Sequence, residues 1–374
     1  EAGAIAAPRP QLLVNADTDP GFPMDAFTEL AEKMREAYRF YDAAEKLQTA
    51  VSPGGHQDTE AIRLPVFSFF LREFLGQTAA LEAEGPIDLP DPAELNCYRE
   101  GQPVDERLTR IDEELVPLAG STSRATKAGL AKLLREEVFR YFPTEPAALE
   151  ATWGEAEIRQ QRSIRTVSFT SFEGLRVKGV YSTPAKAKSG GKLPALLLVD
   201  DRRGIPAWGN TQPLQEKEWG DRAVLIVEVL DRGSRALEQN LRSFQDNDPL
   251  HHLRRQAMVA GTTLESMQMY EILRSLALLR TLPEVDAKRI TILGRGEMGV
   301  NALYAALLDE GDPQVVMVSP TGSHRQGPHY LNVLRYTDIP QVAATLGAKV
   351  KIQGEAPPAL HSVSRCNSLP SCLQ

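Results

Sequence analysis

The sequence predicts an α/β fold: a doubly wound, mostly parallel sheet, preceded by a helical linker and by the C-terminal fragment of a second such module. Three observations predict it. In the second half of the chain, short apolar runs alternate with helical or long connecting segments, as parallel strands with crossover helices do. Two strand-like runs that flank Glu173-Gly174 precede them and predict a hairpin. Near the start, an acidic turn after an apolar run is followed by a His in a Gly-rich turn.

Residues 1–76 are predicted to be the end of a first module. Residues 11–15 are expected to form a buried strand, and Met24 to about Ala50 a helix, because apolar residues recur there at three-and-four spacing. A closing helix is expected from Ala61 to Leu75. One parallel strand with two helices leaves a sheet edge and much apolar surface uncovered, so we expect this fragment to be poorly ordered unless it docks elsewhere.

Residues 77–162 are predicted to be a linker with helices at 105–118 and 122–142, since Pro, Asp, Glu and Gly dominate its beginning. A degenerate second module is expected over 163–354, and an irregular tail over 355–374, which shows no periodicity.

The second module is predicted to open with hairpin strands at 166–172 and 175–181 and to contain a helix at 263–282. Its parallel strands are expected at 195–199, 223–229, 290–293, 315–318 and 350–352.

Composition limits the classes of partner. The chain has 374 residues, 42% of them apolar, and a net charge of −8. This charge argues against nucleic acid or an anionic membrane as the main partner. Apolar runs such as 195–199 are far shorter than the roughly twenty residues of a membrane-spanning helix, so we expect a soluble protein. Its three Cys show neither a disulfide framework nor zinc spacing, and no metal or cofactor is predicted.

Asp19 and His56 are the candidate catalytic residues. An acid after one strand and a later His are the order in which an α/β-hydrolase supplies the last two members of its triad. The carboxylate would orient the imidazole and balance its developing charge. The alternatives are that Asp17 is the acid, or that these Asp residues cap the turn and the helix that follows. The nucleophilic Ser would have to come earlier, so we expect it outside this chain.

A second motif, Gly294-Arg295-Gly296-Glu297-Met298-Gly299, lies between a predicted strand and an Ala-rich helix, where a nucleophile elbow would sit. The pattern G-x-S-x-G would place its Ser at position 296, which is Gly and has no oxygen to attack with. Glu297 is expected to interact with the helix dipole rather than act as nucleophile or base. The motif also matches a dinucleotide-binding pattern, but it does not follow the first strand.

Arg202 and Gly204 follow a predicted strand, where the backbone donors of an oxyanion hole would lie. In the absence of a nucleophile, a role in loop structure is the alternative. Ser323 and His324 are adjacent, so their side chains are not expected to form a catalytic dyad.

The chain resembles the acetyl xylan esterase-like α/β-hydrolases, in particular long bacterial members that look like two hydrolase modules in tandem. The resemblance covers nearly the whole chain and rests on Asp19-Pro20-Gly21-Phe22-Pro23, on Pro53-Gly54-Gly55-His56-Gln57-Asp58-Thr59-Glu60, on residues 294–299 in place of a Ser elbow, and on residues 327–335. It implies a serine esterase that acts on a small ester or an acetylated polysaccharide and is exported or periplasmic, with the nucleophile-bearing half of the first module missing here.

Three interpretations follow. In the first, the chain is the C-terminal portion of a carboxylic-ester hydrolase, is inactive alone, and works with an upstream segment that carries the Ser. In the second, it is a non-catalytic binding or scaffolding protein. In the third, residues 1–75 complete the second module's sheet as a circular permutation, but residues 348–353 already occupy that place in the order.

Overall fold

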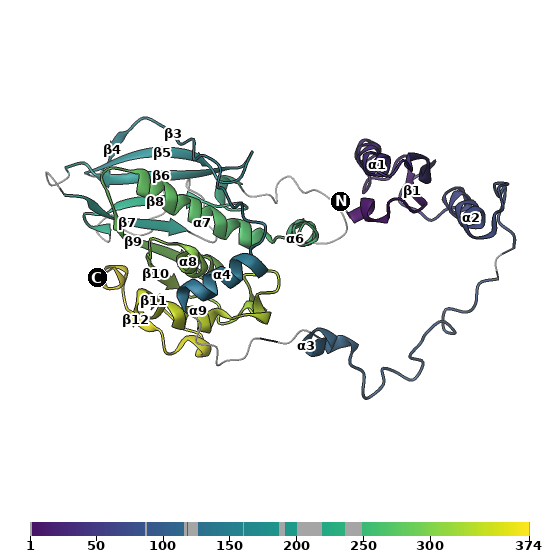
Figure 1. Cartoon of the computed structure of the whole chain (residues 1–374). Coiled ribbons are helices and arrows are strands. Elements are labelled where there is room, and N and C mark those ends of the chain that lie inside the picture. The colour runs from purple at the N-terminus through teal and green to yellow at the C-terminus, as the bar shows by residue number, and fades with distance from the viewer. Residues whose placement is uncertain are drawn as a thin grey trace. The chain divides into compact units, whose positions relative to one another are not determined.

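The chain forms two compact units, residues 1–106 (unit 1) and 107–374 (unit 2), each described here by itself. Figure 1 shows the computed structural model, with labels on many of its helices and strands. The boundary between the two units falls inside the segment 77–162 that the sequence predicts as a linker. The structure describes residues 2–86, 88–115, 118, 126–159, 161–186, 191–199, 219–235 and 249–373.

Unit 1 contains a parallel pair of strands, β1 (Gln11–Ala16) and β2 (Leu47–Ser52), connected through helix α1 (Met24–Arg39). Helix α2 (Glu60–Leu75) follows β2. The predictions of the first strand and the closing helix are confirmed to within one residue.

The prediction of one helix up to Ala50 is wrong, and so is that of a strand without a neighbour. The helix ends at Arg39, and Asp42 has a positive φ of 50° that breaks the helical path. Residues 47–52 then pair with β1, which gives backbone groups on both strands their hydrogen-bond partners. The apolar spacing within one segment carries no information about its pairing with a distant strand.

The core of unit 1 is small. Its buried apolar cluster comprises Met34, Tyr38, Ala43 and Leu47. The Tyr38 hydroxyl lies 2.8 Å from the Arg9 carbonyl oxygen, which ties the segment before β1 to α1. Many large apolar side chains of the unit stay exposed, including Phe67, Phe70 and Phe74 on α2.

Unit 2 contains one large mixed sheet, which has ten strands within the described residues. An antiparallel hairpin, β5 with β6, continues into β8, and from β8 to β12 all neighbours are parallel. The strand order is β12-β11-β10-β9-β7-β8-β6-β5-β3, with β4 beside β5. The strands are β3 (Thr152–Trp153), β4 (Glu157–Arg159), β5 (Arg162–Thr170), β6 (Arg176–Pro184), β7 (Leu193–Val199), β8 (Ala223–Glu228), β9 (Val285–Arg295), β10 (Gln314–Val318), β11 (Val350–Gln353) and β12 (Ser364–Cys366).

This arrangement is that of an α/β-hydrolase-like sheet: a leading hairpin, one exchange of neighbouring strands at β7 and β8, and parallel strands, of which β8 to β11 are joined in chain order by crossover helices. The predicted fold class, hairpin and five parallel strands are confirmed. Sequence reasoning succeeds here because buried parallel strands form continuous apolar runs.

Helices α7 and α8 pack on this sheet, and Figure 1 shows them lying along one face. Thr263 caps α7 through its side chain, which accepts a hydrogen bond from the Ser266 N–H and fixes the predicted start of this helix. Within the described residues, the predicted helix 122–142 corresponds to α4, which ends at Glu137, and the predicted helix 105–118 corresponds to α3. Residues 116–117 and 122–125 of these predictions lie outside the described residues. The helices are α3 (Ile111–Leu115), α4 (Lys127–Glu137), α6 (Pro249–Val259), α7 (Leu264–Thr281), α8 (Glu297–Leu308), α9 (Ile339–Leu346) and α10 (Leu369–Cys372).

The predicted irregular tail instead contains β12, which extends the sheet beside β11, and the short helix α10. A disulfide joins Cys366 to Cys372 within this tail, a pairing that the sequence analysis does not predict. Three residues are too few to show strand periodicity, but the edge of β11 supplies their hydrogen-bond partners. Cys97 is free and exposed.

None of the helices in the described parts of the chain is long and apolar enough to cross a membrane.

We expect unit 1 to unfold at a lower urea concentration than unit 2, because its buried cluster is far smaller. All three Trp residues lie in unit 2, so Trp fluorescence reports that unit alone. Amide exchange over 11–16 and 47–52 should therefore lose protection while Trp fluorescence is still native. Coincident transitions for both probes would contradict this.

Candidate functional site

Asp19 and His56 lie just after β1 and β2, at the same end of the parallel pair. His56 Nδ1 is 2.8 Å from Asp19 Oδ2, within hydrogen-bond distance. The Asp19 side chain is 6% exposed and that of His56 is 71% exposed. The structure thus brings the two predicted residues together, with a fixed acid and a ring that is largely open to solvent.

Hydrogen bonds determine the protonation of this pair. An ionised carboxylate only accepts, so His56 Nδ1 carries the proton and the Nε2 of the neutral ring is left as a base. Asp19 Oδ1 also accepts a hydrogen bond from the Gly21 N–H at 2.8 Å. Burial by itself would raise the pKa of Asp19, but the bonds from His56 and Gly21 outweigh it and hold the pKa below its usual value of 3.8.

Two further residues support the ring, and sequence reasoning missed both. The Phe22 ring stacks on the His56 imidazole, with centroids 5.9 Å apart and planes inclined by 17°. The buried Asn15 side chain donates a hydrogen bond to the Phe22 carbonyl oxygen at 2.9 Å. This bond holds the loop between β1 and α1, residues 17–23 and called the acid loop here, against the end of β1. The sequence feature that could have indicated Asn15 is a polar side chain at the end of an apolar run.

In unit 2, the turn from β9 into α8 has the backbone of a nucleophile elbow. Gly296 has φ 56° and ψ −129°, a conformation that favours glycine. A Cβ at Gly294 would collide with the Met298 carbonyl group, and one at Gly299 would lie 3.0 Å from the Gly294 oxygen. The predicted strand-turn-helix placement of Gly296 is therefore observed, and Gly296 carries no side chain at the position where the pattern G-x-S-x-G would have its Ser.

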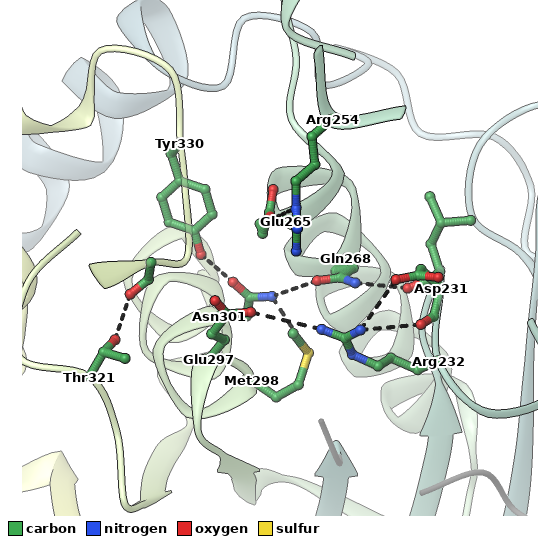
Figure 2. Close-up of polar contacts among 12 residues, drawn as sticks. Asp231, Arg232, Arg254, Glu265, Gln268, Glu297, Met298, Asn301, Thr321 and Tyr330 are labelled. Carbon is green, nitrogen blue, oxygen red and sulfur yellow. Dashed lines mark hydrogen bonds and ion pairs between the residues drawn. The ribbon is translucent and has the colours of Figure 1, made fainter. Parts of the chain in front are cut away.

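Polar side chains lie around this elbow (Figure 2). Glu297 is in the first turn of α8, and its carboxylate is 3.8 Å from the Arg232 guanidinium. One turn further along α8, Asn301 Oδ1 accepts a hydrogen bond from the Tyr330 hydroxyl at 2.5 Å. The Gln268 side-chain amide donates to the Leu230 carbonyl oxygen at 2.8 Å. This network holds strand ends and helices together and is mostly buried.

The last two strands of unit 2 correspond in order and pairing to the β1–β2 pair of unit 1, yet their loops differ. Gly354 and Glu355 follow β11, and Asn367 and Ser368 follow β12. No His therefore follows β12 where His56 follows β2.

The other Ser and His candidates of unit 2 have structural partners. Ser323 Oγ donates to Asp338 Oδ2 at 2.6 Å, and His324 Nε2 lies 2.7 Å from the Tyr304 hydroxyl. Burial lowers the pKa of His324, although its contact with the Pro328 carbonyl oxygen opposes this shift. As expected, the two form no dyad. Arg202 and Gly204 lie outside the described residues.

Comparison with known proteins gives matches at the level of solved structures only. No protein-family model and no curated protein matches the chain. An acetyl xylan esterase candidate from Bacteroides fragilis aligns over 61% of this chain and 66% of its own, at 14% identity and a TM-score of 0.48. Acetyl xylan esterase 1 from a Thermoanaerobacterium species aligns over 64% and 82%, at 16% identity and a TM-score of 0.42.

A glucuronoyl esterase from Solibacter usitatus aligns over 64% of this chain and 76% of its own, at 15% identity and a TM-score of 0.40. The chain spans just under two thirds of the Bacteroides protein. The fold assignment rests on the strand order of unit 2 itself.

The lowered pKa of Asp19 predicts a pH dependence of unit 1 stability. A carboxyl whose folded-state pKa is depressed stabilises the fold above its unfolded value, about 4, and this contribution is lost as the pH falls through the lower folded-state pKa. We expect the urea midpoint of unit 1 to fall from about pH 5 to about pH 2 more steeply in the wild type than in Asp19→Asn. The control, Asp25→Asn in the first turn of α1, should keep the wild-type slope. Equal slopes for wild type and Asp19→Asn would contradict this assignment.

Proposed function

We propose that the chain supplies the acid and the general base of a serine-type carboxylic-ester hydrolase whose nucleophilic Ser lies outside these residues. The observation that carries this proposal is the 2.8 Å contact between Asp19 and His56 at the carboxyl ends of two parallel strands, with the imidazole open to solvent. A carboxylate that orients an accessible imidazole is the base half of a triad.

The reaction would be acyl transfer. His56 Nε2 takes the proton of the Ser hydroxyl as its oxygen attacks the ester carbonyl carbon, and Asp19 balances the charge of the imidazolium. As the carbon–oxygen bond to the alcohol breaks, His56 returns the proton to the leaving oxygen. Water then attacks the acyl-enzyme by the same route, releasing the acid and restoring the Ser.

The substrate class follows from the resemblance of the acid and His motifs to acetyl xylan esterase-like hydrolases: a small ester or an acetylated polysaccharide. The Cys366–Cys372 disulfide supports an exported or periplasmic location, because disulfides persist mainly in oxidising compartments.

A second proposal concerns unit 2, which we assign a non-catalytic binding or scaffolding role. It is supported by Gly296 at the nucleophile position, by Asn367 in the loop after the last strand, and by the buried network around Asn301. The two proposals are compatible, since the first depends only on unit 1.

We expect the 374-residue chain alone to show no saturable hydrolysis of 4-nitrophenyl acetate above the background reaction. Gly296 offers no oxygen, and loss of a nucleophile leaves only the residual rate that binding and nearby dipoles provide. Saturable turnover, lost on substitution of a Ser such as Ser323, would contradict the proposal that the nucleophile lies elsewhere.

In a longer protein that also carries the Ser-bearing segment, His56→Ala should lower kcat by about a hundred- to ten-thousand-fold or more, since the proton transfers are lost. The matched control is His361→Ala, which removes an exposed His of unit 2 and should leave the rate unchanged. Gly296→Ser should add no activity, because the loop directly after β12 carries Asn367 and Ser368 where the loop after β2 carries His56. A near wild-type rate in His56→Ala would exclude the triad assignment.

A further inference from the structure

The pairing of unit 1 continues past its two strands. The β1–β2 register ends at Ala16 opposite Ser52. Beyond it, the Asp17 N–H donates to the Ser52 carbonyl oxygen at 2.9 Å, and the Thr18 N–H to the Gly54 carbonyl oxygen at 3.0 Å. The acid loop and the His loop are therefore joined residue by residue up to the point where Asp19 meets His56.

A further link between the two loops is made by a side chain. Asp17 Oδ1 accepts a hydrogen bond from the Gly54 N–H at 2.9 Å. Gly54 has a φ of +114°, which L residues rarely adopt. Its N–H is directed to a side-chain acceptor, whereas in a regular ladder it would be directed to a backbone carbonyl group. Gly54 is thus held by its N–H and by its C=O.

Little else holds the His56 ring. Its side chain is 71% exposed, and its contacts within the described residues are Asp19 and the stacked Phe22, both on the acid loop. The placement of the imidazole depends on how firmly the backbone two residues earlier is anchored. Asp17 supplies the only side-chain anchor that the structure describes for that backbone.

We infer that Asp17 is a positioning residue for His56: through Gly54 it holds the His loop so that imidazole Nδ1 faces Asp19 and Nε2 remains free. This inference deepens the proposed function and rests on it only in taking His56 as the general base. It also gives Asp17 a role other than the alternative acid, because its carboxylate binds Gly54 and not the imidazole.

The test uses the 374-residue chain and ¹⁵N spectra of the imidazole, recorded where the ring is neutral. Asp17→Ala should raise the share of the Nε2-protonated tautomer severalfold and speed Gly54 amide exchange by about 2- to 12-fold, the range expected for one net hydrogen bond. Asp17→Asn keeps a carbonyl acceptor and should stay within about twofold of the wild type in both readouts. Glu36→Ala, which removes an exposed acid from α1, is the matched control and should change neither.

A wild-type tautomer ratio in Asp17→Ala, or the same change in Asp17→Asn as in Asp17→Ala, would overturn the inference. If Asp17→Ala loses the amide signals of β1 and β2, two neighbouring glycines decide. A Cβ has open space at both Gly54 and Gly55, but only Gly54 has a positive φ. Gly54→Ala should shift the tautomer ratio and Gly55→Ala should not; equal behaviour would also overturn the inference.

These readouts need neither a Ser nor an ester. Failure of the longer protein to hydrolyse esters would therefore reject the proposed function and leave the role of Asp17 standing. An unchanged tautomer ratio would reject the role of Asp17 and leave the esterase proposal standing.

Discussion

The parallel pairing of β1 with β2 is the constraint on which the chemistry proposed for this chain depends. Because both strands run in the same direction, the loops that follow them leave the sheet at one end, and residues far apart in sequence meet there. The contact between Asp19 and His56 is a consequence of that pairing, and so are the backbone links that precede it. A shift of register by one residue would turn Asn15 and the side chains that follow to the other face.

Each unit contains a corresponding parallel strand pair, β1–β2 in unit 1 and β11–β12 in unit 2, but the loops that follow the two pairs carry different residues. In unit 1 the loops after the pair carry an acid and a His. In unit 2 the corresponding loops carry Gly354, Glu355 and Asn367, and a disulfide closes the segment after β12. The turn between β9 and α8 of unit 2 has close glycine backbone contacts and carries Gly296, which has no side chain. Scaffold geometry and chemical groups are therefore separable in this fold.

The sequence was sufficient for features with a local or repetitive signal. Buried parallel strands appear as apolar runs, Thr263 marks a helix start, and the Gly-rich turn identifies His56. The strand β2 could not be predicted, because Leu47 continues the helical spacing and its pairing with β1 is a long-range gain. The three residues of β12 and the Cys366–Cys372 disulfide likewise depend on tertiary contacts. Asn15, Asp17 and Phe22 have roles that only the folded loops define.

The central claim is that His56 serves a Ser outside these residues, and labelling with a fluorophosphonate tests it most directly. The longer protein would be labelled, digested and mapped by mass spectrometry, as wild type and as His56→Ala. We predict a labelled Ser in a segment outside residues 1–374, with labelling slowed by His56→Ala. Label on a Ser of unit 2, or a labelling rate independent of His56, would contradict the account.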